Sequence, residues 1–264
     1  MVWKLVSKPL RAVLGGTIFR ERTVRTIFAG PCFGMRYRVF RDGLSVLYGG
    51  WEPEAQRLMI RHIFPGSVVY DVGANHGIHT LLMARLVGER GRVYAFEPVP
   101  QIFGCLEENM TLNRLINVEC YRIALSDAAK SETFFRGAHH GAGHLSGTGS
   151  AEGGQIVVET DTIDAMAARP GARLPDFIKM DVEGAEGKVL AGAEHVLAEK
   201  HPVLLIDLHN PKQDLEVGSV LRKFGYVAYR TKDGSSVENP DKSWPDPHGL
   251  WGKIIALPKR AACL

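Results

Sequence analysis

The chain has 264 residues, enough for one sizeable α/β domain with an extension, and 45% of them are hydrophobic. The formal net charge of +3 is too small to indicate nucleic-acid binding. No apolar stretch reaches the roughly 18 residues that a membrane span requires, and the four cysteines form no Cys-x-x-Cys pair, so we expect a cytoplasmic protein with free thiols.

The first part of the chain, residues 1–50, is predicted to form an extension ahead of the main domain. Residues 1–30 mix basic and apolar side chains, which predicts a basic amphipathic helix. We expect this helix to pack on the main domain, and the alternative is weak peripheral contact with an anionic membrane or a partner. Two runs of strand-forming residues, 35–40 and 44–48, flank an Asp-Gly turn and predict a β-hairpin.

Strands and helices alternate along residues 51–264, the predicted main domain. Pro53 is a residue type that often begins a helix, and helices are expected at 54–63, 77–87, 99–112, 160–168 and 186–198. Strands are expected at 68–71, 92–96, 117–121, 176–180, 203–208 and 251–257. This alternation predicts a doubly wound α/β fold with a mostly parallel sheet that is covered on both faces.

A stretch rich in Gly, His and Ser, residues 137–154, shows no periodicity. It predicts a mobile loop, which we interpret as a lid over a ligand site. A zinc site through His139, His140 and His144 is the less favoured alternative, because no cysteine or fixed helical spacing supports it.

The run Asp71-Val-Gly-Ala-Asn-His-Gly77 follows a β-branched strand and leads into a helix. Ligands of open parallel sheets bind outside the carboxyl ends of the strands, and the glycines allow a close approach of backbone to ligand. A dinucleotide fingerprint would place a glycine where Asn75 stands, so the loop favours a ligand without a pyrophosphate. Glu97 ends the next strand, about twenty residues later, as expected of a carboxylate that binds two ribose hydroxyls.

These residues and later motifs resemble the FkbM family of class I S-adenosylmethionine-dependent methyltransferases. The resemblance implies a seven-stranded Rossmann-like methyltransferase sheet, S-adenosylmethionine as cofactor, and methyl transfer, usually to an oxygen. His76 and Asp207 depart from the commoner pattern, which has a hydrophobic or small residue and a Glu at these positions. The matching stretches run in order at 50–54, 71–77, 96–98, 108–113, 124–127, 162–164, 177–186, 189–193 and 202–209.

Carried over position by position, the resemblance implies three contacts with the cofactor. Glu97, next to Pro98, would hold the ribose, and the turn at Ser126 and Asp127 would lie beside the adenine. The loop after the first strand would hold the amino-acid end. The loop residues concerned are Asp71, Gly73, Ala74, Asn75 and Gly77.

Candidates for the chemistry cluster where the strands at 176–180 and 203–208 end. Asp181 is the first choice for contact with the acceptor or with the cofactor's amino group, and Glu183 is the second, as a base or orienting acid. Glu186 would share a helix face with Glu183, and we interpret it as a charge stabilised by the helix start. His209 is a candidate base because its charge changes near neutral pH. Together with Asp181, Asp207 and Asn210 it also offers donors for a divalent metal, which spacing alone does not favour.

The sequence therefore predicts a methyltransferase domain at 51–264 that methylates a hydroxyl oxygen of a small molecule or saccharide, without a nucleic-acid partner. One alternative is a nicotinamide-dependent oxidoreductase, against which the missing middle glycine argues. The other is a binding or scaffold module that docks through residues 1–30. The acceptor and the oligomeric state stay open.

Overall fold

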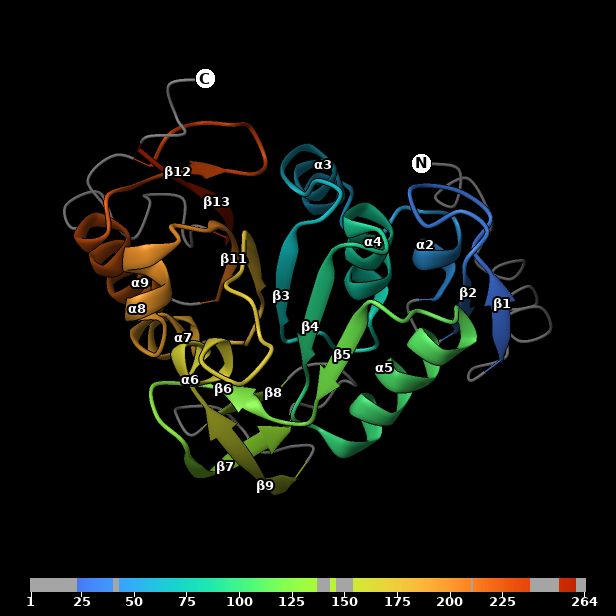
Figure 1. Ribbon diagram of the computed structural model, residues 1–264, viewed down its shortest axis with the longest axis horizontal. Helices are drawn as coiled ribbons and strands as arrows, with labels where there is room; N and C mark the ends of the chain where they lie inside the picture. Colours follow the sequence, from blue (N-terminus) through green and yellow to red (C-terminus); the bar gives the residue numbers. More distant parts are fainter. Residues whose placement is uncertain are drawn as a thin grey trace.

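A seven-stranded sheet runs through the middle of the molecule in the computed structural model (Figure 1), which describes residues 23–39, 43–136, 143–145, 154–209, 211–237 and 252–259. The strand order is β12-β13-β11-β10-β3-β4-β5, and β13 is antiparallel to both of its neighbours. Strands that follow β3 along the chain lie on both sides of it, so the order reverses between β3 and β10. The strands are β3 (Val68–Val72), β4 (Arg92–Phe96), β5 (Val118–Tyr121), β10 (Phe177–Met180), β11 (Val203–Leu208), β12 (Tyr226–Arg230) and β13 (Gly252–Pro258).

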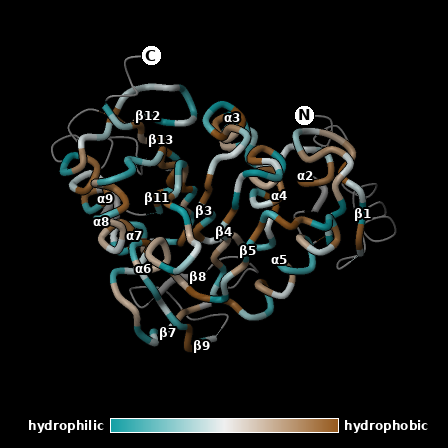
Figure 2. The backbone as a smooth tube through the Cα atoms, in the orientation of Figure 1, coloured by the Kyte–Doolittle hydropathy of each residue, from teal (hydrophilic) through white to brown (hydrophobic). Residues whose placement is uncertain are grey.

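Helices cover both faces of this sheet, as a doubly wound fold requires. Side chains alternate along β3, so Val68 and Tyr70 pack in one core cluster and Val69 packs in the other. Figure 2 shows the hydrophobic residues along these central strands. One face is covered by α2 (Gly43–Leu47), α3 (Pro53–His62), α4 (Ile78–Val87) and α5 (Pro100–Leu112). The other is covered by α6 (Ile163–Ala167), α7 (Glu186–Ala191), α8 (Glu194–Glu199) and α9 (Pro211–Lys223).

A second, four-stranded sheet lies below the main one in Figure 1, in the order β6-β9-β7-β8. Its strands are β6 (Ala124–Leu125), β7 (Lys130–Arg136), β8 (Gly143–Leu145) and β9 (Gln155–Asp161). The prediction of a loop throughout 137–154 is wrong at β8, which pairs antiparallel with β7 and includes His144. Gly and His residues give no recognisable strand pattern in the sequence. The strand forms through its backbone pairing with β7. His139 and His140 lie outside the described residues, so the lid and the zinc site stay predictions.

The predicted β-hairpin in the extension is wrong. β2 (Arg36–Arg38) pairs antiparallel with β1 (Val24–Thr26), and Gly43–Leu47 is the helix α2. The helix forms because Val46 and Leu47 become buried in the core, where tertiary packing overrides strand propensity. The amphipathic helix predicted for 1–30 does not include β1, and residues 1–22 lie outside the described part of the chain. None of the described helices is long and apolar enough to cross a bilayer.

The helices and strands predicted for the main domain are otherwise found within a few residues of their expected bounds, with two differences. The helix expected at 186–198 is divided into α7 and α8 at Gly192. A Cβ on Gly192 would lie 2.1 Å from the backbone oxygen of Ser126, so the chain passes too close to that turn for any side chain. The helix expected at 160–168 begins later, because the hydroxyl of Thr162 accepts a hydrogen bond from the backbone N–H of Ala165 and caps α6.

Candidate functional site

A buried ion pair lies beneath the loop that follows β3. Parallel pairing sets Lys179 of β10 directly beside Asp71 of β3, with Nζ 3.4 Å from Oδ1. β3 continues to Val72, so Asp71 lies within the strand, has no exposed surface and accepts a hydrogen bond of 2.6 Å from the Thr80 hydroxyl. Burial lowers the pKa of Lys179, but the carboxylates of Asp71, Asp181 and Glu52 outweigh it and raise the pKa. Lys179 is therefore a cation held inside the sheet.

The loop itself is fixed by backbone contacts that need glycine. Lys179 Nζ donates a hydrogen bond of 2.8 Å to the Gly73 oxygen, and the N–H groups of Gly73 and Ala74 both donate to Phe96. Gly73 has φ +74°, and a Cβ there would lie 1.9 Å from the backbone oxygen of Asp181. Gly77, with φ +86°, would meet the Leu106 side chain at 2.6 Å in the same way. Gly73 is thus required by close approach to backbone as well as by φ, whereas at Gly77 the φ angle is the stronger requirement because the Leu106 side chain can move.

Glu97 holds the middle of this loop from the end of β4. Its Oε2 accepts a hydrogen bond of 3.1 Å from the Asn75 N–H, and its Oε1 accepts one of 2.9 Å from Val99, beyond Pro98. Burial raises the pKa of Glu97 to about 7 despite these two bonds. Asn75 has φ +51°, a conformation that Asn tolerates better than most residues. The two predicted cofactor contacts, loop and carboxylate, therefore meet at the carboxyl ends of neighbouring strands.

Asn109 of α5 supports the loop from the other side. This residue has no exposed surface, and its Nδ2 donates a hydrogen bond of 2.7 Å to the His76 oxygen. Its Oδ1 accepts a hydrogen bond of 2.8 Å from the N–H of Arg38 in β2. The Arg38 guanidinium also forms an ion pair with Glu108. A single amide thus connects the extension with the loop.

The turn predicted to lie beside the adenine is held by the second sheet. Ser126 is fully buried, its N–H donates to the Asp161 oxygen at 2.8 Å, and its hydroxyl donates to Asp127 Oδ1 at 3.2 Å. Asp127 is exposed. Ala124, just before the turn, packs in one small cluster with Val99. The turn therefore neighbours the segment that carries Glu97, and the adenine contact stays a prediction.

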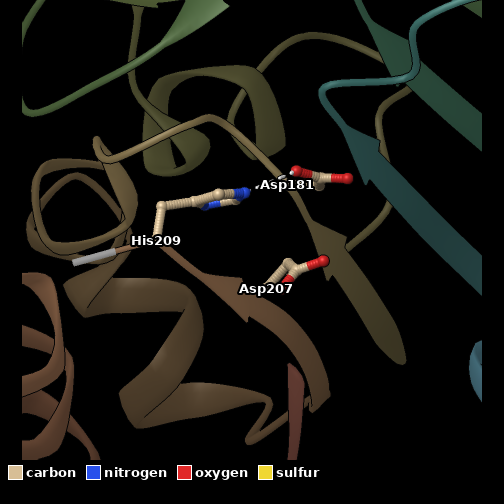
Figure 3. Close-up of side chains that lie close together, drawn as sticks. All are labelled: Asp181, Asp207 and His209. Carbon is tan, nitrogen blue, oxygen red and sulfur yellow. Dashed lines mark ion pairs between the residues drawn. The ribbon is translucent and has the colours of Figure 1, made fainter. Parts of the chain in front are cut away.

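The predicted acids near the ends of β10 and β11 lie around one histidine. Nε2 of His209 lies 3.5 Å from both Asp181 Oδ1 and Glu183 Oε2, and Nδ1 lies 2.9 Å from Glu186 Oε1. Figure 3 shows the imidazole pointing toward Asp181, with Asp207 nearby on β11. Burial lowers the pKa of His209, but the hydrogen bond to Glu186 and the carboxylates of Glu183 and Asp181 outweigh it and raise the pKa to about 9.

One expectation about this group needs correction. Glu183 has φ +54° and precedes α7, so it does not share a helix face with Glu186. Glu186 is the first residue of α7, as expected of a helix-start charge, and it is also fully buried and bonds to His209 and to the Gly184 N–H. Burial also raises the pKa of Glu183.

A pocket opens beside these acids, and several of its polar residues were missed from the sequence. Lys253 of β13 forms ion pairs with two acids that line the pocket. Its Nζ lies 2.5 Å from Glu52 Oε2 and 3.0 Å from Asp207 Oδ2. His79 is buried, and burial together with nearby Lys179 lowers its pKa to about 3, so it is neutral. The polar and charged lining residues are Glu52, His79, Lys179, Asp181, Asp207 and Lys253.

One sequence signal could have found part of this set. Lys179 is the one charged residue in the apolar run of β10, and a lysine in a buried strand needs a buried acid as partner. Lys253 and Glu52 lie far apart in the sequence, so only the fold brings them together.

Known proteins match this chain over most of the main domain. A family model described as "Methyltransferase FkbM domain" matches residues 71–228. The 31-O-demethyl-FK506 methyltransferase FkbM of Streptomyces tacrolimicus is 30% identical over 210 residues, which cover 67% of this chain and 80% of that protein. The hexuronic acid methyltransferase AglP of Haloferax volcanii is 29% identical over 160 residues, 60% of this chain and 62% of that protein.

The match to the AMB antimetabolite synthetase AmbE of Pseudomonas aeruginosa is 28% identical, covers 61% of this chain and spans only 10% of that protein. A solved structure, a methyltransferase FkbM from Methylobacillus flagellatus, is 17% identical with a TM-score of 0.47, over 82% of this chain and 53% of that one. Because the family model covers more than half of its length, the chain belongs to the methyltransferase FkbM family, which confirms the S-adenosylmethionine-dependent enzyme class that its motifs predicted.

Proposed function

We propose that the chain transfers the methyl group of S-adenosylmethionine to a hydroxyl oxygen of a saccharide or another polar small molecule. Two relatives, by their names, act on a hexuronic acid and on 31-O-demethyl-FK506. A pocket lined by Glu52, Asp207 and Lys253 suits an acceptor that offers several hydroxyl groups, because charged side chains both accept and donate hydrogen bonds to them.

This proposal rests on the positions of the candidate residues at the ends of the strands. The loop after β3 and Glu97 after β4 lie on one side of the point where the strand order reverses. Asp181 after β10 and His209 after β11 lie on the other. Ligands of open α/β sheets bind at such a point, so a cofactor on the first pair would face an acceptor on the second.

We propose the cofactor contacts that the family resemblance implies, with one change. Asp71 is fully buried and bonds to Thr80 and Lys179, so we assign it to positioning the loop beneath the cofactor's amino-acid end. Glu97 would accept hydrogen bonds from the ribose hydroxyls. The remaining contacts are proposed for Gly73, Ala74, Asn75, Gly77, Pro98, Ser126 and Asp127.

The chemistry asks the chain to align the acceptor oxygen and to accept its proton. When bound, S-adenosylmethionine supplies an electrophilic methyl group. We propose Asp181 as the group that takes the proton, since its carboxylate borders the pocket. A pKa of about 9 makes His209 a cation at neutral pH, so it would hold Asp181 and Glu183 in place rather than act as the base.

Calorimetric titration with S-adenosylhomocysteine tests the cofactor half. We expect micromolar binding that is weakened at least about tenfold in Glu97→Gln, the loss of roughly one charge-assisted hydrogen bond. Glu159→Gln, in which an exposed carboxylate on β9 is changed, should bind as the wild type does. Methyl transfer from labelled S-adenosylmethionine to uronic acids and other hydroxylated saccharides tests the acceptor half. Absence of cofactor binding by the wild type would refute the proposal.

The remaining expectations about location and partners are proposals as well. We propose that the chain acts in the cytoplasm, which the free thiols of Cys32, Cys105 and Cys120 support. Peripheral membrane contact would depend on residues 1–30, most of which lie outside the described part of the chain.

A further inference from the structure

We propose that Asp181, Asp207 and His209 bind a divalent metal ion that accepts both oxygen and nitrogen ligands, Mn²⁺ in the first place. One ligand atom from each residue lies within 4.8 Å of the other two (Figure 3). Metal–ligand bonds to carboxylate and imidazole are about 2.0–2.6 Å long, so ligands on opposite sides of one ion are about 4–5 Å apart. The three groups are therefore close to the separation that a single ion needs.

The orientation of His209 is the one that metal-binding histidines have. Such histidines use one ring nitrogen for the metal and donate the other N–H to a carboxylate or carbonyl. Nδ1 of His209 lies 2.9 Å from Oε1 of Glu186, which is fully buried and is held in turn by the Gly184 N–H at 3.1 Å. Nε2 is thereby directed at Asp181, as Figure 3 shows, and an ion there would take the place of its proton.

The charges around this position favour a cation. The carboxylates of Asp181, Glu183 and Glu186 all lie within 3.5 Å of the His209 imidazole, and Lys179, which lines the same pocket, is already paired with Asp71. Asp207 shares the Lys253 ammonium with Glu52, and that contact uses only its Oδ2. The carboxylates therefore outnumber the cations that neutralise them, and a divalent ion would correct the excess.

A separate observation on α4 also points to a ligand in the same pocket. His79 lines the pocket together with Asp181 and Asp207, and its side chain is only 7% exposed. Within the described part of the chain its Nε2 makes no hydrogen bond, and Glu52 Oε2 is 3.6 Å away. A buried polar atom without a partner destabilises a protein unless a ligand or water supplies one. The pocket wall thus carries a polar atom suited to an ion's water or to an acceptor oxygen.

The role of the ion rests on the proposed function. A metal at the ends of β10 and β11 would bind the acceptor hydroxyl and lower its pKa, which makes the proton easier to remove. It would also hold that oxygen in a fixed position for methyl transfer. With an ion bound, Asp181 and Asp207 would act as ligands through which the acceptor is positioned, and the neighbouring carboxylate of Glu183, in place of Asp181, would accept the proton.

Electron paramagnetic resonance of Mn²⁺ tests the site without any assay of activity. The full chain is freed of metal with a chelator and titrated with MnCl₂, and the six-line signal of free Mn²⁺ is followed. We expect one ion per chain with micromolar affinity, together with a nitrogen coupling from the imidazole. Both Asp207→Asn and His209→Ala should weaken binding at least about tenfold, as expected for the loss of one ligand. His195→Ala is the matched control, because His195 forms an exposed pair with Glu199 at 2.9 Å.

The proposal is overturned if Mn²⁺ does not bind saturably, or if His209→Ala and His195→Ala bind it equally. Circular dichroism of each variant identifies any that does not fold. In that case the nitrogen coupling of the wild type and the Asp207→Asn titration decide. Titration of the same samples with S-adenosylhomocysteine separates the two proposals. Cofactor binding without Mn²⁺ binding refutes the metal site alone, whereas loss of both refutes the proposed function too.

Discussion

We expect the carboxyl of Glu97, the proposed ligand of the ribose, to make cofactor binding depend on pH. Burial raises its pKa to about 7, and only the ionised form can accept hydrogen bonds from two ribose hydroxyls. The affinity for S-adenosylhomocysteine should be constant from about pH 8.5 to about pH 8. It should then fall by up to about tenfold per pH unit below about pH 7, and the measurement extends to about pH 5.5. Calorimetry over this range measures it, and a flat profile in the wild type would contradict the assignment.

The same carboxyl affects stability with a defined sign. Its pKa in the folded protein lies above the ordinary value of 4.5. The folded state therefore binds the proton more tightly than the unfolded state. The contribution of Glu97 to the free energy of unfolding is fully present at low pH and is lost as pH rises through about 7. Glu97→Gln should remove this dependence in urea unfolding.

The ion pair of Lys179 and Asp71 should behave as a unit. Lys179→Met leaves the fully buried Asp71 without its cation, and removal of one partner of a buried pair costs about 3–5 kcal/mol. In a chain that already carries Asp71→Asn, the same change should cost clearly less, because no buried charge is left unpaired. Urea unfolding of the four proteins measures the coupling, and additive effects would show that the pair is not coupled.

The roles of residues in this site were predictable from the sequence only where they depend on the local backbone conformation. Gly73, Asn75 and Gly77 form a recognisable strand–loop–helix pattern, and the structure shows the positive φ angles that such a pattern implies. Lys179 stands out in the sequence as a charge within a buried strand, but its partner and that of Glu186 could not be assigned, because they depend on strand register and on the approach of β11.

At the scale of elements, Gly73 keeps the loop after β3 against the end of β10. Gly73→Ala would place a Cβ 1.9 Å from the Asp181 oxygen, so the two segments must separate. We expect loss of S-adenosylhomocysteine binding by at least about tenfold and a loss of stability above the 1–3 kcal/mol of backbone strain alone. Gly171→Ala controls for strain, since Gly171 has φ +80° with no atom within 4 Å of the added Cβ. Equal effects of the two changes would contradict this explanation.

Six strands of the main sheet were predictable because they are apolar runs between helical patterns, whereas α9 and β12 were not predicted. β3 is buried along its whole length, and this pattern leaves little choice of structure. The second sheet was missed because β7 and β9 are separated in the sequence by a Gly-rich stretch, so their pairing is a contact between distant segments. The hairpin was wrongly predicted at Val46 and Leu47, because the burial of these residues is decided by packing on the core.

For the molecule as a whole, the extension and the loop after β3 are joined through Asn109. Asn109→Ala removes one hydrogen bond from the Arg38 N–H and one from the His76 oxygen. Leaving buried polar groups unpaired costs about 1–3 kcal/mol each, and we expect weaker binding of S-adenosylhomocysteine as the loop relaxes. Asn113→Ala is the control, because its side-chain bonds go to the backbone of Arg36 and Asn109 and do not reach the loop. Calorimetry should show a change only in the first variant.

Lys253 has a consequence for how the enzyme is made. Its ammonium pairs with Glu52 and Asp207, and it belongs to β13, which lies between β11 and β12 (Figure 1). During translation, Glu52, the loop after β3 and Asp207 are synthesised before this lysine. Until then the two carboxylates lack their shared cation and repel each other across the pocket. The pocket that Glu52 and Asp207 line is therefore completed only when β13 has been made and has paired with β11 and β12.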